Sequence, residues 1–476
     1  MFTFDEIIQA VTGAEVRTGA PAFKEASVDS RAVGAGTLFA AIPGEVTDGH
    51  KFIASAFEKG ASAALIEEDV PDAYPVIDLR EGFNAAADLS AVREGKPYLI
   101  RVKNTIEALQ QTAKIRREDM ADVQVIGITG TVGKTSTKEV VGDLLATKYR
   151  TLKTAGNMNN EIGLPLTLLH AEAGIEKAIL EMGFYVPGEI AQLCGIGKPS
   201  VGIVTNVGMV HASRAGSMEV IAAGKSELVQ ALPANGTAIL NCDDPYVRPM
   251  AEKARASVLY YGTTSEADLY ASELESDGLN GIRCKLNCHG ETYHIVSPLI
   301  GSHSVYTALR ATAAGIVCGM TREEIEAGLR VSRNMLRMNI LHTPSGALVI
   351  DDTYNASPAS TIAALNLLAE MKGTKYAVLG EMRELGQYEV KGHAMVGKRA
   401  AQVADEVIAV GPATMHLANA ALEEGMNTER VHWFETVAES IAYLKMLPLD
   451  EGTAMLVKGS RGMRMEQIIE ALEAKA

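Results

Sequence analysis

The sequence predicts an α/β protein of three domains, with a central parallel sheet that has helices on both faces. Two observations carry this prediction. The chain has 476 residues, which is too long for one ordinary hydrophobic core. Short apolar runs also alternate with helical patterns, as in a doubly wound parallel sheet. We therefore expect domains at residues 1–115, 116–332 and 333–476, of which the first is a smaller α/β domain.

The N-terminal domain combines short strands with helices. Residues 38–42 and 63–66 are strand-like, and residues 50–61 between them have a helical pattern. Residues 69–98 are polar and contain several prolines and glycines, so we expect an insertion or long irregular loop there. A further helix is predicted to begin near residue 105, with Asn104 or Thr105 as its N-cap.

The middle domain opens on a glycine-rich turn between a strand and a helix. Residues 123–128 form a short apolar run, Gly130-Thr-Val-Gly-Lys134-Thr135 follows, and a helical pattern comes next. Such a turn points backbone N–H groups at phosphate, and the helix dipole adds to the attraction. Lys134 would reach the β- and γ-phosphates, and the Thr135 hydroxyl would bind Mg²⁺. We predict that ATP is bound by Gly130, Thr131, Gly133, Lys134, Thr135 and Ser136.

The spacing of this loop departs from the common form, because Ile128 stands where a glycine is expected five residues before Gly133. A Gly-Lys-Thr triplet can also be an ordinary turn. The strand before it and the helix after it favour the phosphate-binding interpretation.

Further strands are predicted at residues 178–182, 201–207 and 238–244, with helices at 162–170 and 218–232. Ligands of open α/β sheets bind at the carboxyl ends of the strands, where Glu181, Asn206 and His211 fall. The last domain has four strand-like runs at 348–352, 376–380, 406–411 and 455–459. They predict a second open, Rossmann-like sheet with a binding edge of its own.

Composition excludes several classes of function. Lys and Arg number 44 against 59 Asp and Glu, and the net charge of −15 argues against a nucleic-acid surface. We expect no membrane span and no signal peptide, because no apolar run approaches ~20 residues and the first residues include acidic side chains. The five cysteines suggest reduced thiols in a cytoplasm. Cys284, Cys288 and His289 could belong to a metal site, but strand residues are the favoured interpretation.

Several motifs together point to a family. The loop at 127–139 is joined by Asn159-Asn160-Glu-Ile-Gly, Asp351-Asp352-Thr-Tyr-Asn355, Lys458-Gly-Ser-Arg461 and Asp29-Ser30-Arg31. In this combination the chain resembles the Mur ligases of bacterial cell-wall synthesis, over nearly its whole length apart from 69–98. The loop alone is shared by all Mur ligases and folylpolyglutamate synthase. The other motifs resemble the family member that acts on D-alanyl-D-alanine.

This resemblance implies an ATP-dependent peptide ligase of peptidoglycan precursor synthesis. Such an enzyme joins D-alanyl-D-alanine to UDP-N-acetylmuramoyl-tripeptide through an acyl phosphate, and releases ADP and phosphate. The implied cofactors are ATP and Mg²⁺ at two sites. The implied protein is cytoplasmic and monomeric.

The resemblance also implies roles for individual residues. Lys134, Glu181, His211 and Lys225 would be catalytic, and Mg²⁺ would be held by Thr135, Glu181, His211 and a carbamylated Lys225. Each role has a simpler structural alternative. Glu181 could cap a helix, a single histidine is more often structural, and Lys225 could lie on a solvated helix face.

The remaining residues would bind the nucleotide and the substrates. Arg337 and Asp352 would contact ATP, and Asn159 and Asn160 would line the cleft. The peptide end of the substrate would meet Asn355, Lys458 and Arg461. The UDP-sugar would meet Ser30, Arg31, Thr47 and Asp48.

Two positions depart from the family pattern. The motif His-Asn-x-x-Asn is here His303-Ser304-Val-Tyr-Thr307, so the asparagine that reads adenine is replaced by the shorter Thr307. Ser357 stands where an asparagine precedes the proline. The first change puts the usual adenine contact in doubt, and the second loosens one expected amide contact.

Three other functions stay open at this point. The chain could be another Mur-type ligase or a polyglutamate-adding ligase. It could be a non-catalytic nucleotide-binding switch, although such a protein would be expected to have lost some of the catalytic residues. A simple kinase is less favoured, because no motif for a hydroxyl-activating base accompanies the loop.

Overall fold

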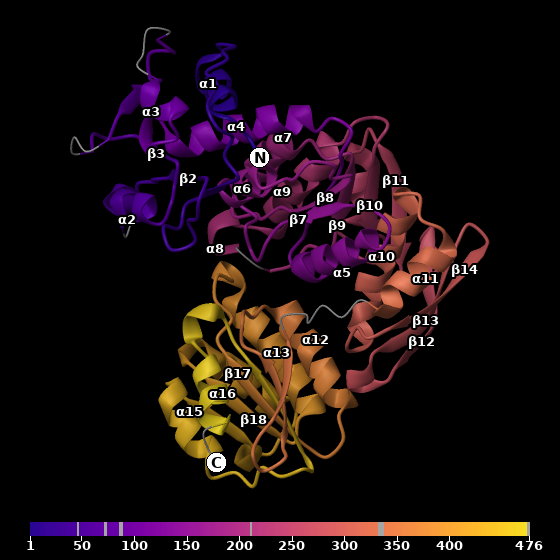
Figure 1. Ribbon diagram of the computed structural model, residues 1–476. Helices are drawn as coiled ribbons and strands as arrows, with labels where there is room; N and C mark the ends of the chain where they lie inside the picture. The colour runs from indigo at the N-terminus through magenta and orange to yellow at the C-terminus, as the bar shows by residue number, and fades with distance from the viewer. Residues whose placement is uncertain (45–46, 71–73, 85–88, 210–211, 332–337, 474–476) are drawn as a thin grey trace.

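The computed structural model describes residues 1–44, 47–70, 74–84, 89–209, 212–331 and 338–473. They form three sheets in chain order, of five, nine and six strands (Figure 1). The mixed α/β architecture predicted from the sequence is confirmed. Among the described residues, no helix is long and apolar enough to cross a membrane.

The N-terminal sheet is parallel, with the order β1-β2-β3-β5-β4. Its strands are β1 (Glu25–Ser27), β2 (Thr37–Ala40), β3 (Ala63–Ile66), β4 (Val76–Asp78) and β5 (Tyr98–Arg101). Its helices are α1 (Phe4–Thr12), α2 (Ile53–Glu58), α3 (Ser90–Arg93) and α4 (Thr105–Asp119). As predicted, Asn104 caps α4, since its side chain accepts from the N–H of Glu107 at 2.8 Å.

The expectation of an irregular stretch at 69–98 is wrong in part, because β4 and α3 lie within it. Strand β4 pairs with β5 at the edge of the sheet. Only its central residue, Ile77, is buried, and Val76 and Asp78 are exposed. A strand so short, with one inward side chain, gives too weak an alternation to be seen in sequence.

The middle sheet has the order β14-β13-β12-β11-β10-β9-β6-β8-β7. Strands β6 to β12 pair in parallel, and β12, β13 and β14 pair antiparallel. The strands are β6 (Gln124–Thr129), β7 (Thr151–Lys153), β8 (Lys177–Glu181), β9 (Val201–Val204), β10 (Thr237–Asn241), β11 (Ser257–Gly262), β12 (Leu269–Ser276), β13 (Ile282–Cys288) and β14 (Glu291–Ser297). Cys284 and Cys288 lie buried in β13, which confirms the strand interpretation.

Helices cover both faces of this sheet. One face packs on α5 (Lys134–Ala146), α10 (Val305–Val317) and α11 (Arg322–Val331), which lie together in Figure 1. The other face packs on α6 (Gly163–Leu169), α7 (Glu189–Gly197) and α9 (Met218–Ala231), and its apolar core continues into the N-terminal sheet. The short helix α8 (Ala212–Ala215) precedes α9.

The C-terminal sheet has the order β15-β16-β20-β17-β18-β19, and all pairs but β15–β16 are parallel. The four predicted strands correspond to β16 (Leu348–Asp352), β17 (Thr374–Gly380), β18 (Glu406–Val410) and β20 (Thr453–Lys458). The edge strands β15 (Asn339–His342) and β19 (Val431–Phe434) were not predicted. The helices are α12 (Pro358–Glu370), α13 (Glu389–Val403), α14 (Met415–Glu423), α15 (Val437–Leu444) and α16 (Glu466–Glu473).

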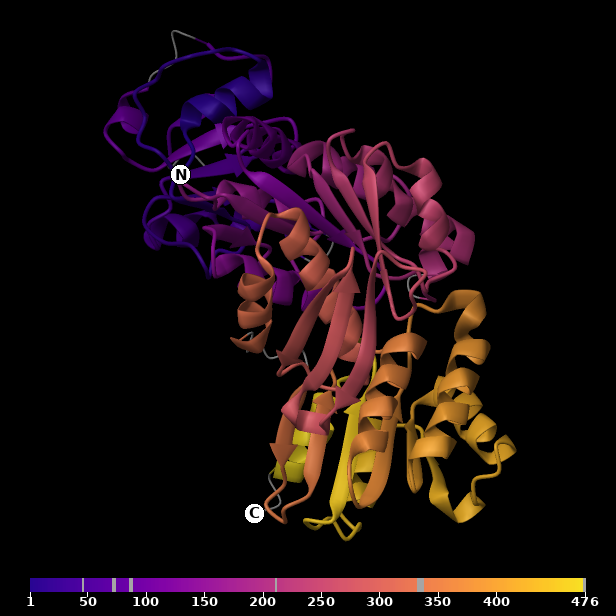
Figure 2. The ribbon, with the colours of Figure 1, turned by 90° about the vertical axis from the view of Figure 1, so that its right-hand side faces the viewer.

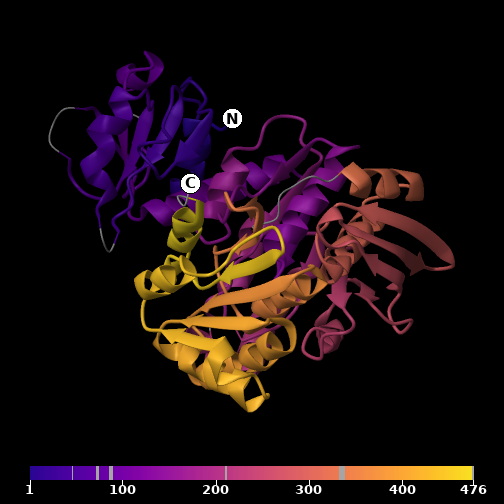
Figure 3. The ribbon, with the colours of Figure 1, turned by 90° about the horizontal axis from the view of Figure 1, so that it is seen from below.

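The C-terminal domain meets the middle domain at two places. The antiparallel strands β12, β13 and β14 reach down beside the C-terminal domain in Figure 2, and the hydroxyl of Ser276 at the end of β12 donates to Glu370 at 2.6 Å. The segment around α8 also touches it, since Gln387 donates to the carbonyl of Gly216 at 2.8 Å. Seen from below, the N-terminal and C-terminal domains lie over different parts of the middle domain (Figure 3).

Candidate active site

The glycine-rich loop joins the carboxyl end of β6 to the first turn of α5. Gly130 has φ +142°, and a β-carbon there would lie 1.8 Å from the Thr205 hydroxyl, so only glycine fits. Gly133 begins the helix in a left-handed conformation with φ +83°. The Lys134 ammonium donates to the carbonyls of Gly130 at 2.8 Å and Thr131 at 3.2 Å. Lys134 therefore lies over the loop, where phosphate would be bound.

Asn206, at the end of β9, braces the loop. Its backbone carbonyl accepts from the N–H of Thr131 at 2.9 Å, and its side chain exchanges two 2.9 Å hydrogen bonds with the backbone of Val132. The Thr131 hydroxyl accepts from the N–H of Gly208 at 2.8 Å. The sequence pointed to Asn206 as a strand-end residue but not to this role.

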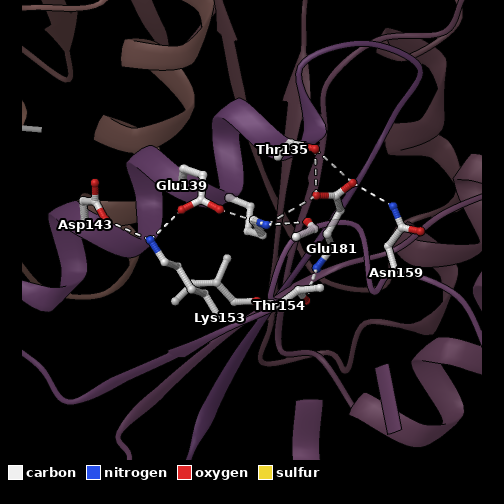
Figure 4. Close-up of polar contacts among 10 residues, drawn as sticks. Thr135, Glu139, Asp143, Lys153, Thr154, Asn159 and Glu181 are labelled. Carbon is white, nitrogen blue, oxygen red and sulfur yellow. Dashed lines mark hydrogen bonds and ion pairs between the residues drawn. The ribbon is translucent and has the colours of Figure 1, made fainter. Parts of the chain in front are cut away.

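Glu181 ends β8 beside the start of α5. Its side chain is 1% exposed. The Thr135 hydroxyl lies 3.0 Å from its Oε2, and the Asn159 amide donates to its Oε1 at 2.8 Å (Figure 4). The structure thus brings the predicted Thr135, Asn159 and Glu181 together. Asn160 instead contacts the start of α6, where its Oδ1 accepts from the N–H of Gly163 at 2.9 Å.

A line of alternating charges, which we call the charge chain, runs from Glu181 to the surface. Lys138 is completely buried and lies 3.9 Å from Glu181 and 2.9 Å from Glu139. Lys153 then bridges Glu139 at 2.5 Å and Asp143 at 3.0 Å (Figure 4). Burial would raise the pKa of Glu139, but the ammonium groups of Lys153 and Lys138 outweigh burial and lower it.

Lys225 lies within α9 and is 3% exposed, so the alternative of a solvated helix face is wrong. Its ammonium nitrogen lies 5.0 Å from the centroid of the Phe184 ring. None of the described residues forms a hydrogen bond or ion pair with it. Burial lowers the pKa of Lys225 well below its ordinary value, and the positive charge of Lys134 lowers it further. Burial therefore favours the neutral, nucleophilic form of this amine.

The C-terminal domain brings three of its predicted residues together. The Lys458 ammonium lies 2.5 Å from Asp352 and donates to the carbonyl of Asn355 at 2.8 Å. Burial raises the pKa of Asp352, although the Lys458 ammonium opposes this. Arg461 is exposed, with its guanidinium 5.8 Å from the centroid of the Tyr354 ring. Charged groups thus gather at the adjacent ends of β16 and β20.

The predicted residues of the N-terminal domain lie in its loops. Arg31 is exposed and pairs with Asp29 at 2.8 Å, and the carbonyl of Ser30 accepts from Lys59. Asp48 accepts from the N–H and the ring of His50 at 2.9 and 2.7 Å. Thr47 is exposed, and its carbonyl accepts from Gly44. In this structure Asp48 is a helix cap.

The divergent motif at residues 303–307 lies behind the phosphate-binding loop. His303 is largely buried, and its Nδ1 has no hydrogen-bond partner among the described residues. Burial lowers the pKa of His303. Thr307 is buried on α10, and its hydroxyl accepts from Arg310 at 3.0 Å. His211 and Arg337 lie outside the described residues. Ser136 lies on the first turn of α5.

Three family models match the chain in succession. They are the Mur ligase family catalytic domain at residues 23–117, the Mur ligase middle domain at 128–315 and the Mur ligase glutamate ligase domain at 336–461. Together they cover most of the chain, in the order of the three sheets. The chain belongs to the Mur ligase family.

Two relatives illustrate how similar this Mur ligase is to known members. It is 33% identical to UDP-N-acetylmuramoyl-tripeptide–D-alanyl-D-alanine ligase of Bacillus subtilis, over 94% of this chain and 92% of the relative. It is 32% identical to the protein of the same name from Escherichia coli, over 94% and 93% of the two chains.

Solved structures agree with this. The chain is similar to MurF from Acinetobacter baumannii, with 29% identity, a TM-score of 0.83 and coverage of 100% and 99% of the two chains. It is also similar to the MurF ligase from Thermotoga maritima in complex with ADP, with 27% identity, a TM-score of 0.77 and coverage of 95% and 97%.

Sequence reasoning missed Lys138 and Arg310 in this Mur ligase site, and it missed the role of Asn206. Lys138 lies one helical turn after Lys134, and its spacing alone could have placed it on the same face of α5. The brace by Asn206 depends on where β9 ends beside the loop. Arg310 lies in the divergent motif, where nothing in the sequence distinguished it from a solvated helix arginine.

Proposed function

We propose that this chain is the ATP-dependent ligase that joins D-alanyl-D-alanine to UDP-N-acetylmuramoyl-tripeptide in peptidoglycan precursor synthesis. The observation that carries the proposal is the near full-length match to relatives with that name at 32–33% identity. The local geometry supports it, because Lys134, Thr135 and Glu181 meet at one loop and Lys225 is close enough to Lys134 for their charges to interact. We place the reaction in the cytoplasm.

The reaction needs two anions to meet. A carboxylate oxygen of the tripeptide attacks the γ-phosphorus of ATP, the bond to the bridging oxygen breaks, and ADP leaves. The amine of D-alanyl-D-alanine then attacks the acyl carbon of the acyl phosphate. Phosphate leaves with the former carboxylate oxygen, and the nitrogen loses a proton as the amide forms. Positive charge must offset the repulsion between the two anions, and Lys134 supplies it at the loop.

The residues present fit a magnesium ion. Mg²⁺ prefers one or two carboxylates together with phosphate oxygens and water, and the buried Glu181 carboxylate and the Thr135 hydroxyl offer hard oxygen atoms 3.0 Å apart. When bound, Mg²⁺ would neutralise charge on the transferring phosphoryl group. Asn159 orients the Glu181 carboxylate, and the Lys138 ammonium lies 3.9 Å from it.

A carbamate on Lys225 would complete a second metal site, which we place together with His211. Because burial favours the uncharged form of its amine, Lys225 is suited to attack CO₂, and the product is an anion that the nearby charge of Lys134 would stabilise. The same reaction converts a buried cationic residue into an oxygen ligand.

The outer domains supply binding residues in this proposal. Asp352 and Arg337 would contact the nucleotide, and Asn355, Lys458 and Arg461 the peptide end of the substrate. Ser30, Arg31, Thr47 and Asp48 would hold the UDP-sugar. The domains would comprise residues 1–115, 116–332 and 333–476, and closure of the third domain over the second would bring these groups together.

A substrate panel tests the proposal. ATP-dependent phosphate release is measured with UDP-N-acetylmuramoyl-tripeptide and D-alanyl-D-alanine, and then with single amino acids or glutamate as the acceptor. We expect release that depends on the dipeptide. Release with glutamate alone would favour a polyglutamate-type ligase, and the absence of phosphate release with every acceptor would favour a non-catalytic nucleotide-binding switch.

A further inference from the structure

Arg310 is a buried cation that none of the described carboxylates pairs with. It lies on α10 and is 4% exposed. Its Nη2 donates to the Thr307 hydroxyl at 3.0 Å, and its Nε has no hydrogen-bond partner among the described residues. No carboxylate within the described parts of the chain forms an ion pair with it. Burying an unpaired charge costs several kcal/mol, so such an arginine is unusual unless a ligand completes it.

The guanidinium lies against the phosphate-binding loop. Its Nη2 is 3.2 Å from the position that a β-carbon on Gly133 would take, and Gly133 begins α5. On the other side, its Cζ lies 5.9 Å from the centroid of the Tyr261 ring. The Tyr261 hydroxyl is held by the carbonyls of Val204 and Thr205 at 3.1 and 3.0 Å. The ring, Thr307 and Gly133 therefore fix the guanidinium beside the helix N-terminus.

A second buried arginine shows what a purely structural role looks like in this protein. Arg117 is 7% exposed and also lacks a carboxylate partner among the described residues. Each of its three nitrogens, however, donates to a backbone carbonyl: Nε to Gly197, Nη1 to Met120 and Nη2 to Val123, at 2.9, 2.5 and 3.1 Å. Arg117 is satisfied within the fold. Arg310 keeps donors to spare beside a loop that binds anions.

We propose that Arg310 is a nucleotide-binding residue, whose guanidinium donates to a phosphate group of the nucleotide held by the loop at Gly130–Gly133. This inference rests on the proposed function, because it takes the loop to bind ATP. The shorter Thr307 leaves room for the guanidinium and holds it through its hydroxyl. In the family pattern, the amide of an asparagine at position 307 contacts the adenine base. In this chain, the Arg310 guanidinium would instead contact a phosphate group.

Binding of ADP, measured by calorimetry without turnover, tests the inference. The proteins are the wild type, R310M, R310K and the matched control R117M, each with its thermal unfolding midpoint recorded. R310M is expected to bind ADP at least about tenfold more weakly than the wild type, as for the loss of a charged hydrogen bond. R310K keeps the charge but not the planar fork, so its affinity should lie between the two. R117M should unfold at a lower temperature and bind ADP as the wild type does.

Two results would overturn the inference. The first is that R310M binds ADP as tightly as the wild type does; if R310M does not fold, the same result with R310K counts. The second is that R310M loses affinity for ADP but not for GDP, because a phosphate contact predicts the same fold-change in affinity for both nucleotides. Either result leaves the ligase proposal standing if the wild type releases phosphate with its substrates. A wild type that binds no ADP would overturn both.

Discussion

The Thr135 hydroxyl lies 3.0 Å from Oε2 of Glu181, and this contact joins the first turn of α5 to the carboxyl end of β8. This contact places a buried carboxylate beside the phosphate-binding loop, with Asn159 and Lys138 around it. A hydroxyl and a carboxylate so placed offer oxygen ligands where a metal ion could also meet nucleotide phosphates. The predictions below test the groups around this pair.

Lys134→Ala is expected to abolish turnover and leave the fold intact. The Lys134 ammonium donates to the backbone carbonyls of Gly130 and Thr131, which places its positive charge at the loop where the phosphates of ATP would be bound. The measurement is phosphate release with all substrates present, alongside a thermal unfolding curve. Lys198→Ala is a matched control, since Lys198 pairs with Glu118 on the surface. Near-normal phosphate release by Lys134→Ala would disprove the role of the loop.

Lys225→Ala should lose most of its activity and recover part of it in added formate or acetate. A small carboxylate can occupy the space of the missing carbamate and supply an oxygen ligand. The assay is phosphate release at rising carboxylate concentration. Lys134→Ala serves as the control, because an added anion cannot replace a cation. No recovery at any concentration would count against the carbamate.

The lowered pKa of Lys225 predicts a pH-dependent stability. Between the lowered folded value and the ordinary value of about 10.4, the unfolded chain binds a proton that the folded chain does not. The free energy of unfolding should therefore rise with pH through this window, and Lys225→Met should remove that contribution. Urea denaturation in bicarbonate-free buffer at several pH values measures the difference between the two proteins. Parallel pH profiles would show that Lys225 is not neutralised by folding.

Lys138→Met should destabilise the protein by about 3–5 kcal/mol, because it leaves the buried carboxylate of Glu181 and the half-buried carboxylate of Glu139 without their shared cation. Added Mg²⁺ should restore more stability to this variant than to the wild type. Lys153→Met is the control at the outer end of the charge chain. That partly exposed pair is worth at most about 1 kcal/mol. Equal losses in the two variants would mean that the inner pair carries no special weight.

The sequence predicted the fold best where one residue type leaves few alternatives. Gly130 and Gly133 flank a turn that only glycine can make, and the strand and helix on either side predicted that turn. Asn104 likewise predicted the start of α4, because asparagine is a favoured N-cap residue. Edge strands such as β4 and β15 were not predicted, because β4 buries one side chain, β15 only half-buries two, and both are held by their neighbours in the sheet.

In the candidate site, the sequence predicted the residues that lie within recognisable motifs, but not the contacts around them. Thr135 was predicted from the glycine-rich loop itself, and Glu181 and Lys225 were predicted because their motifs resemble those of a family. The network around them was not, since Lys138, Asn206 and Arg310 acquire their roles from contacts between segments far apart in the chain. Asn159 and Asn160 are adjacent in sequence but differ for the same reason, because Asn159 contacts Glu181 in another segment and Asn160 contacts the backbone of nearby Gly163.

The most direct test follows one oxygen atom. The tripeptide substrate is prepared with oxygen-18 in the carboxylate of its third residue, and the phosphate released in the presence of ATP and D-alanyl-D-alanine is analysed by mass spectrometry. If that carboxylate takes the phosphoryl group and then passes to the amine, each released phosphate carries one oxygen-18. Unlabelled phosphate accompanying full product formation would contradict the account.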